Sequence, residues 1–181
     1  MIFYLFLILL FFIFFILADF KWPYIYQRKL ILLCPYILLI VISIFRFDVG
    51  YDYPTYYEMS NDINDDGVER LEPLSYCLVV IASFIQQPFV IFILFGLPTY
   101  ILYFIACKQT KNMGIAFWTF IFLFWLDTFG VVRQAIAMSI IAYAITAMQN
   151  KKMYTYILLC IIASLFHLSA LVMLPIYFVY H

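Results

Sequence analysis

Residues 46–72 carry most of the side chains in this apolar sequence that can do chemistry. The stretch holds eight of the ten acidic residues. Its first eleven positions contain an arginine, two aspartates and three tyrosines that we single out: Arg46, Asp48, Asp52, Tyr51, Tyr53 and Tyr56. Carboxylates bind hydroxyl groups, tyrosine rings stack on the faces of sugar rings, and a guanidinium fork suits phosphate. We therefore expect a sugar-binding surface here; charges that are merely solvated at a helix end are the alternative.

Four further polar residues interrupt apolar sequence: Glu72, Arg133, Gln134 and His167. Arg133 suits a phosphate or diphosphate if it faces a cavity, and anchors a helix at the membrane surface if it does not. His167 is an intramembrane ionisable group and hence a candidate for function, with a buried histidine bonded to a neighbouring helix as the alternative. Glu72 stands directly before Pro73, where it either points into the same cavity or caps a helix.

The composition indicates what must position these residues. Of the 181 residues, 68% are apolar and only 11% are charged, which is typical of an integral membrane protein. The formal net charge is zero, which argues against a nucleic-acid partner. Four cysteines stand singly in or beside apolar runs and read as small core residues, not as metal ligands or disulfides: Cys34, Cys77, Cys107 and Cys160.

The pattern of apolar runs predicts an all-α fold, a polytopic transmembrane helix bundle of about six spans that forms one membrane domain over residues 1–181. The six expected spans are residues 2–18, 30–45, 88–107, 113–126, 131–149 and 153–178. Residues 73–85 are too few for an ordinary span, and Gln86-Gln87-Pro88 separates them from the next run. We expect them to form an interfacial or re-entrant helix beside a cavity.

The basic residues set the expected sidedness of the bundle. Seven of the ten fall into three clusters: Lys21/Arg28/Lys29, Lys108/Lys111 and Lys151/Lys152. Positive charge favours the cytoplasmic side, so the N-terminus and the loop 46–72 are expected outside, and the chain end His181 as well. This topology brings six polar residues to the outer face: Arg46, Asp48, Asp52, Glu72, Arg133 and His167.

No cofactor and no metal site are expected. Residues 62–67, Asp-x-Asn-x-Asp-Gly, match the opening of a calcium-binding EF-hand loop. The bidentate acid of such a loop would stand at position 73, which is proline. We interpret the segment as an acidic turn.

Four motifs in this order resemble the EpsG family, bacterial membrane proteins related to the Wzy-like O-antigen polymerases. The first, Arg46-Phe-Asp48-Val-Gly50-Tyr-Asp52-Tyr53-x-x-Tyr56, is similar to the family signature R-x-x-x-G-x-D-Y-x-x-Y, with Tyr51 where the family usually has threonine. The others are Glu72-Pro73-Leu74, Val132-Arg133-Gln134 and Ala163-x-x-x-His167-x-Ser169. Family members usually continue with more spans, so the chain resembles the N-terminal part of a longer protein.

The resemblance implies a glycosyltransferase that polymerises exopolysaccharide, capsule or O-antigen repeat units at the outer face of the bacterial cytoplasmic membrane. The substrates it implies are oligosaccharides linked to undecaprenyl diphosphate, with other polysaccharide export proteins as further partners. On this hypothesis Arg46 and Arg133 bind the diphosphate, and His167 or Asp52 takes the acceptor proton. The remaining candidates would bind sugar: Asp48, Tyr53, Tyr56, Glu72 and Gln134.

Three other functions are compatible with the same kind of bundle. A transporter or flippase for a lipid-linked sugar would need a cationic cavity, but one that is reachable from both faces. A non-catalytic membrane subunit of a polysaccharide export complex would need contacts with a partner and no catalytic residues. An acyltransferase with an intramembrane histidine is a third alternative, although the loop rich in acids and tyrosines suits sugar better.

Overall fold

The computed structural model describes residues 2–19, 25–62, 66–85, 87, 89–110 and 113–181. These residues form helices and turns, with no strand among them. The helices are α1 Ile2–Asp19, α2 Ile25–Ile44, α3 Tyr53–Asn61, α4 Asp66–Glu69, α5 Pro73–Ile85, α6 Phe89–Lys108, α7 Met113–Leu123, η1 Asp127–Phe129, α8 Val132–Gln149, α9 Met153–Ser164, η2 Leu168–Met173 and α10 Ile176–Tyr180. The all-α expectation is confirmed.

One helix among the described residues, α6, is both long and apolar enough to cross a membrane by length and composition. It corresponds to the span expected over residues 88–107. The short helix expected over residues 73–85 is α5, with the same bounds. Of the three residues expected to break the chain after it, 86 and 88 lie outside the described part, and the backbone N–H of Val90 donates to the Gln87 carbonyl.

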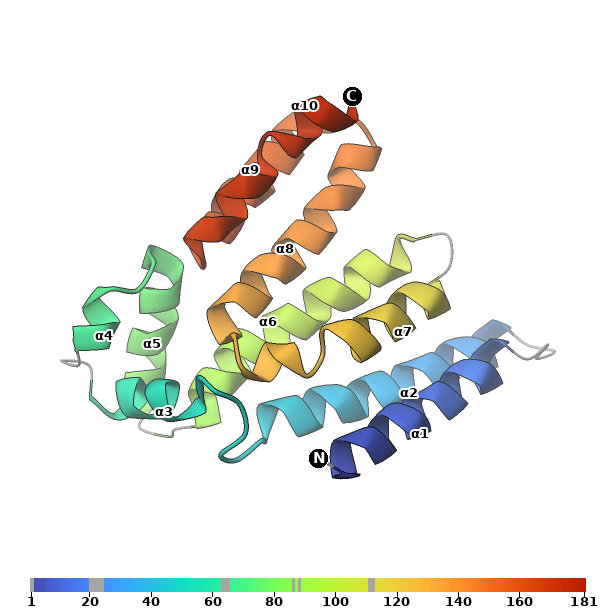
Figure 1. Ribbon diagram of the computed structural model, residues 1–181, viewed down its shortest axis with the longest axis horizontal. Coiled ribbons are helices and arrows are strands. Elements are labelled where there is room, and N and C mark those ends of the chain that lie inside the picture. The colour runs from blue at the N-terminus through green and yellow to red at the C-terminus, as the bar shows by residue number, and fades with distance from the viewer. Residues whose placement is uncertain (1, 20–24, 63–65, 86, 88, 111–112) are drawn as a thin grey trace.

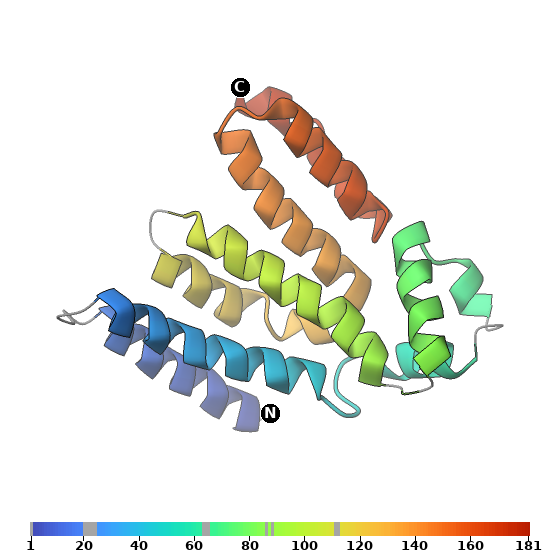
Figure 2. The ribbon, with the colours of Figure 1, turned by 180° about the vertical axis from the view of Figure 1, so that it is seen from behind.

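α6 lies at the centre of the fold (Figures 1 and 2). It packs against α2, α5, α7 and α8, while α9 packs on α8 and α1 on α2. Trp125, fully buried, joins the N-terminal helices to the turn before α8. Its Nε1 donates to Ser43 Oγ at 2.8 Å, and Phe11 meets it edge-on with ring centroids 5.8 Å apart. This core fixes η1, and η1 in turn fixes the start of α8.

The expected sixth span over residues 153–178 is wrong. α9 ends at Ser164, and His167 adopts an extended conformation with φ −157° and ψ 118°. The chain then runs back along α9, where Tyr177 contacts the ring of Tyr156 with centroids 5.5 Å apart. His181 reaches the far end of α8, with Nε2 2.9 Å from the Met148 carbonyl oxygen. The chain end therefore lies at the end opposite to the one expected.

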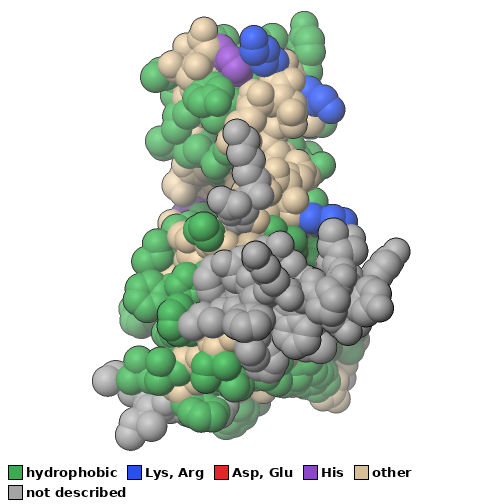
Figure 3. All heavy atoms as spheres, turned by 90° about the vertical axis from the view of Figure 1, so that its right-hand side faces the viewer, with side chains coloured by type: hydrophobic (Ala, Val, Ile, Leu, Met, Phe, Trp, Pro, Cys, Tyr) green, Lys and Arg blue, Asp and Glu red, His purple; other side chains and the backbone are tan. Residues whose placement is uncertain are grey.

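The two ends of the bundle differ in charge. α6 ends at Lys108, and Lys151 and Lys152 stand between α8 and α9. The loop that leads from α2 to α5 lies at the other end (Figure 1). Figure 3 shows lysine or arginine side chains on the face turned to the viewer, among the described residues. Histidine is visible there too, but no acidic side chain is. Lys21 and Lys111 lie outside the described residues, as do the side chains of Arg28 and Lys29.

Candidate functional site

The loop after α2 is held in an unusual backbone conformation. Asp48 and Gly50 have positive φ angles of 51° and 106°. A Cβ on Gly50 would lie 1.9 Å from the Phe129 carbonyl oxygen, so only glycine permits this approach. The loop therefore crosses η1 in contact with its backbone.

Arg46 lies between two aromatic rings at the start of this loop. Its guanidinium carbon is 4.8 Å from the centroid of Phe92 and 4.8 Å from that of Phe129. Both distances are within the range of cation–π attraction. The rings belong to α6 and η1, so the charge of Arg46 is fixed next to the N-terminal end of α8. No sequence signal marked Phe92 or Phe129 as partners of an arginine.

Three expected site residues meet at Glu72, from segments far apart in the sequence. Arg133 Nη1 donates to Glu72 Oε2 at 2.7 Å. His167 Nδ1 lies 3.2 Å from Glu72 Oε1, and the backbone N–H of Leu168 donates to the same oxygen at 3.2 Å. The Glu72 side chain is only 18% exposed, and those of Arg133 and His167 are 31% exposed. The carboxylate thus joins the first turn of α8 to the break after α9.

The backbone around Glu72 is fixed by a junction between two helix ends. The first N–H groups of a helix and its last carbonyl groups have no partner within the helix. Here the N–H of Leu74 in α5 donates to the carbonyl of Leu165 at 3.0 Å. Ser75 Oγ donates to the carbonyl of Phe166 at 2.9 Å. α5 begins where α9 ends, and His167 leaves the helix to face Glu72.

Asp52 and Tyr56 surround Arg133 on its other side. The N–H of Val132 donates to Asp52 Oδ2 over a long 3.4 Å. Arg133 and Arg46 both attract the Asp52 carboxylate, which therefore stands in the field of two cations. The ring of Tyr56 packs edge-on against Phe95, and the charge of Arg133 acts on its hydroxyl group. Arg133 thus lies between two carboxylates, that of Glu72 just before α5 and that of Asp52 just before α3.

Burial and charge shift the pKa values of these groups in different directions. Burial raises the pKa of Asp52 above its ordinary value, although the Val132 N–H and the two arginines oppose the shift. Burial would also raise the pKa of Glu72, but backbone N–H donors, Arg133 and His167 outweigh it and lower the pKa. Burial raises the pKa of Tyr56 despite Arg133. Glu72 is therefore an anion, and Tyr56 a neutral hydrogen-bonding group.

Three expected site residues stand apart from this cluster. Asp48 is exposed in the turn after α2. Tyr53 is 7% exposed, and its ring stacks on Phe92 with centroids 4.7 Å apart. That ring face is already covered by protein, and the Tyr56 ring, 3% exposed, is buried as well. Gln134 faces a different part of the surface from Arg133, its neighbour in α8.

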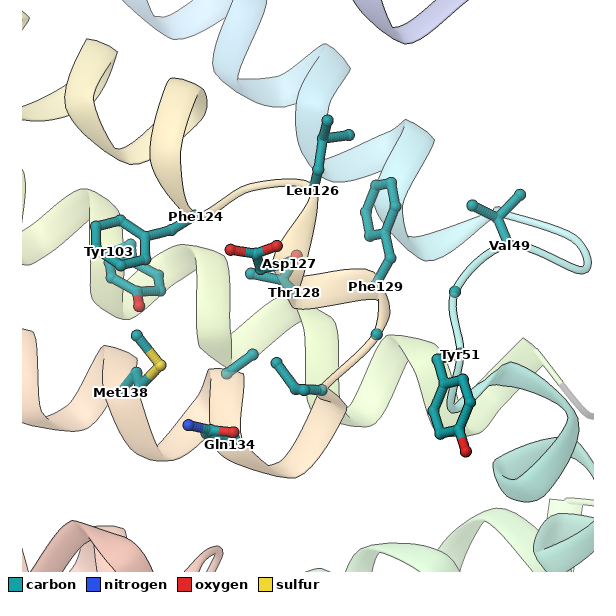
Figure 4. Close-up of a pocket in the computed structure, with 14 residues that line it drawn as sticks. Val49, Tyr51, Tyr103, Phe124, Leu126, Asp127, Thr128, Phe129, Gln134 and Met138 are labelled. Carbon is teal, nitrogen blue, oxygen red and sulfur yellow. The ribbon is translucent and has the colours of Figure 1, made fainter. Parts of the chain in front are cut away.

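Gln134 lines a cleft that none of Glu72, Arg133 and His167 lines. The cleft has a volume of about 760 Å³ and lies between the 49–51 loop, α6, the segment from Phe124 to Val131 that includes η1, and α8. Figure 4 shows Asp127 from η1 and Gln134 from α8 on its walls, with Tyr51 at one end. Tyr51 is 91% exposed. Sequence analysis placed Tyr51 in the expected sugar-binding surface but missed Asp127, and it did not bring either residue to Gln134, because the three come from separate elements.

Among the described residues no group of three or more His, Cys, Asp or Glu side chains could hold a metal ion. The expected acidic turn over residues 62–67 includes residues 63–65, which lie outside the described part. The described cysteines, Cys77, Cys107 and Cys160, are free thiols. The chemistry available at Glu72 is therefore that of an arginine, two carboxylates and an imidazole.

Comparison with known proteins agrees with the motifs at this site. No curated protein and no solved structure matches the chain. The model of the EpsG family matches residues 29–181, a range that includes Arg46, Asp52, Glu72, Arg133 and His167. The chain therefore belongs to the EpsG family, which is made up of membrane proteins of polysaccharide biosynthesis.

Proposed function

We propose that this chain is a polysaccharide polymerase, a glycosyltransferase that joins oligosaccharide repeat units carried on undecaprenyl diphosphate. The observation that supports it best is the contact of Arg133 and His167 with one carboxylate at the end of the bundle away from Lys108 and Lys152. A cation and a base held together suit a reaction that expels a diphosphate and removes a proton. The product would be exopolysaccharide, capsule or O-antigen.

In the proposed reaction a hydroxyl group of one repeat unit attacks the anomeric carbon of another. The new bond joins the hydroxyl oxygen to that carbon, and the bond from carbon to the diphosphate oxygen breaks. Undecaprenyl diphosphate leaves with the electron pair. Its negative charge grows in the transition state, where Arg133 and Arg46 stabilise it. The proton of the attacking hydroxyl passes to His167, or to Asp52, whose raised pKa makes it a stronger base.

We place the sugars on the exposed side of the same end. The cleft beside Gln134 falls within the size range of small-molecule sites and offers a carboxylate, an amide and an exposed tyrosine ring. Asp48 adds an exposed carboxylate at the loop. Tyr53 and Tyr56, whose rings are buried, support the loop from beneath. Glu72 has protein partners on both oxygens, so we assign it no sugar contact.

The proposed setting is a multi-pass bundle in the bacterial cytoplasmic membrane, with the loop 46–72 outside. The described lysines lie at the opposite end, as the positive-inside rule requires for the cytoplasmic side. The two described arginines of the site lie at one end only. A transporter would need its cationic cavity to be reached from both ends, so this arrangement favours the enzyme.

The test is the length of polysaccharide in a strain that lacks the gene and is complemented with variants. We expect long chains with wild type, and single repeat units with Arg133→Ala or His167→Ala. Loss of one transition-state charge contact lowers rates by roughly 10²–10³-fold. Lys152→Ala and His181→Ala are matched controls, since they remove an exposed cation and the other histidine at the opposite end. Membrane levels of each variant are measured alongside.

Long chains with both Arg133→Ala and His167→Ala would exclude these residues as the catalytic centre and favour a non-catalytic subunit. Repeat units that stay on the inner leaflet in the deletion strain would favour the flippase. Single units on the outer leaflet are expected of a polymerase.

A further inference from the structure

The two oxygens of Glu72 serve two different functional groups. Oε2 accepts a hydrogen bond from Arg133, and Oε1 lies 3.2 Å from His167 Nδ1. Glu72 cannot move far, because the Leu74 and Ser75 hydrogen bonds fix the backbone next to it against the end of α9. The carboxylate is therefore placed to control the imidazole and the guanidinium at once.

The two nitrogens of the His167 ring have different surroundings. Nδ1 is fully buried, and no described group meets it in aligned hydrogen-bond geometry. The acceptor within ion-pair distance is Glu72 Oε1. The side chain as a whole is 31% exposed, so the exposure belongs to the remainder of the ring, which carries Nε2. A small rotation of the ring would align an Nδ1–H with the carboxylate.

In a neutral imidazole one nitrogen carries the proton and the other carries the lone pair. The hydrogen bond made by one nitrogen decides which form is present. A carboxylate can only accept, so its presence beside Nδ1 favours a proton on that nitrogen. The lone pair then lies on Nε2, on the exposed side of the ring, where a substrate hydroxyl can reach it.

We propose that Glu72 is the positioning residue of this site, which holds His167 as the Nδ1–H tautomer and aims Arg133 with the same carboxylate. The catalytic part of this inference rests on the proposed function, in which His167 is the base. The tautomer itself does not depend on that function. Glu72 acts through His167 and Arg133 and has no contact of its own with the reacting atoms.

Glu72→Gln is the informative substitution, because it keeps the shape and replaces the acceptor Oε1 with a donor. The change gives up the bond from the Leu168 N–H and presents a donor to His167 Nδ1. A glutamine amide has a single oxygen, and the charged donor Arg133 attracts it most strongly. The NH₂ group is then left facing His167 Nδ1. It donates to Nδ1, so the ring proton must move to Nε2. The variant would therefore retain its fold around Arg133 but offer no lone pair on the exposed side.

The chain has only two histidines, which makes the tautomer directly measurable. In a His181→Gln background His167 is the single reporter, and ¹⁵N-histidine labelling of the full chain in lipid nanodiscs shows which nitrogen carries the proton. The spectra compared are those of the neutral imidazole, which carries one ring proton. We expect Nδ1–H in this background and Nε2–H after Glu72→Gln. Glu58→Gln, at an exposed acid of the same loop, should leave Nδ1–H in place.

A proton on Nε2 of His167 in the His181→Gln background, with Glu72 unchanged, would overturn the inference. This outcome does not depend on whether the Glu72→Gln variant folds. An unchanged spectrum after Glu72→Gln would overturn it too. Polysaccharide formation gives the second readout, with an expected loss of roughly 10²–10⁴-fold for a histidine in the wrong tautomer. A shifted tautomer with normal polysaccharide would instead refute His167 as the base, and with it that part of the proposed function.

Discussion

At the scale of single residues, the site depends on a glycine that no other residue can replace. Gly50 combines a φ of 106° with a contact between its Cα and the backbone of η1. The contact lets the loop lie flat, so that Arg46 reaches between Phe92 and Phe129 and Asp52 reaches Val132. The conformation of Gly50 thus positions two charged side chains, those of Arg46 and Asp52.

Gly50→Ala is expected to destabilise the fold and to lower activity. The added Cβ would meet the carbonyl oxygen and carbon of Phe129 at 1.9 and 2.5 Å, and backbone atoms cannot move aside as a side chain can. The positive φ alone costs about 1–3 kcal/mol. Thermal unfolding of the purified protein in detergent measures the effect.

Gly130→Ala is the matched control, because a Cβ there would come no closer than 3.8 Å to its neighbours. Its φ of −92° suits any residue. Equal unfolding temperatures for the two variants would contradict the role given to Gly50.

At the scale of elements, the junction between α5 and α9 positions the site. α9 has only 12 residues, and the carbonyls of the two residues that follow it, Leu165 and Phe166, accept hydrogen bonds from the start of α5. Because these hydrogen bonds are made across the bundle, the helix does not continue and His167 turns out of it. The same junction brings Glu72 next to the break. Two short helices thereby create a polar site between them, one that a continuous helix would not form.

Ser75→Ala should weaken this junction. Ser75 is fully buried, and its loss leaves the Phe166 carbonyl without this donor. The expected cost is about 1–2 kcal/mol of unfolding free energy, since a buried acceptor is left unsatisfied. Unfolding in detergent, followed by circular dichroism, is the measurement.

Ser83→Ala in the same helix is the control. Ser83 Oγ bonds to the Val80 carbonyl of its own helix, which is a local contact. A change of less than about 0.5 kcal/mol is expected there. If Ser75→Ala were equally mild, the junction would not be what fixes the end of α9.

At the scale of the whole molecule, the described part of the chain places the loop after α2 and the lysines Lys108, Lys151 and Lys152 at opposite ends. The reversal after His167 then returns the chain to the lysine end, where His181 contacts the Met148 carbonyl. A straight span would have carried His181 to the other end instead. The proposed sidedness and the reversal of the chain after His167 together predict which of three exposed positions can be reached from outside the cell.

Single cysteines at positions 58, 152 and 181, each in a chain freed of its native cysteines, test this prediction. An impermeant maleimide should label Glu58→Cys on intact cells. Lys152→Cys and His181→Cys should be labelled only after permeabilisation, since both lie at the proposed cytoplasmic end. If His181→Cys and Glu58→Cys were both labelled from outside, residues 153–178 would form a straight span and the reversal after His167 would be refuted. External labelling of Lys152→Cys would reverse the proposed sidedness.

The sequence alone determined the local features of this protein. Apolar runs in a membrane protein fold into helices because each turn satisfies its own backbone, so most helical segments and their order follow from the sequence, whereas the break after Ser164 does not. The tight turn at Gly50 follows from one residue type. The separated basic clusters predicted one sidedness for the bundle, which remains to be tested. The four ordered motifs resembled one family, and the family match bears out that resemblance.

Only the tertiary structure decided which polar residues meet. Glu72 and Arg133 are 61 positions apart, and no periodicity relates them. Tyr53 and Tyr56 resembled sugar-stacking residues, yet their rings pack against α6, because α3 lies on that helix. The end of α9 at Ser164 depended on donors supplied by α5, from another part of the chain. Helix formation depends on residues that are neighbours in the sequence, whereas a site of this kind depends on which helix ends meet in the folded chain.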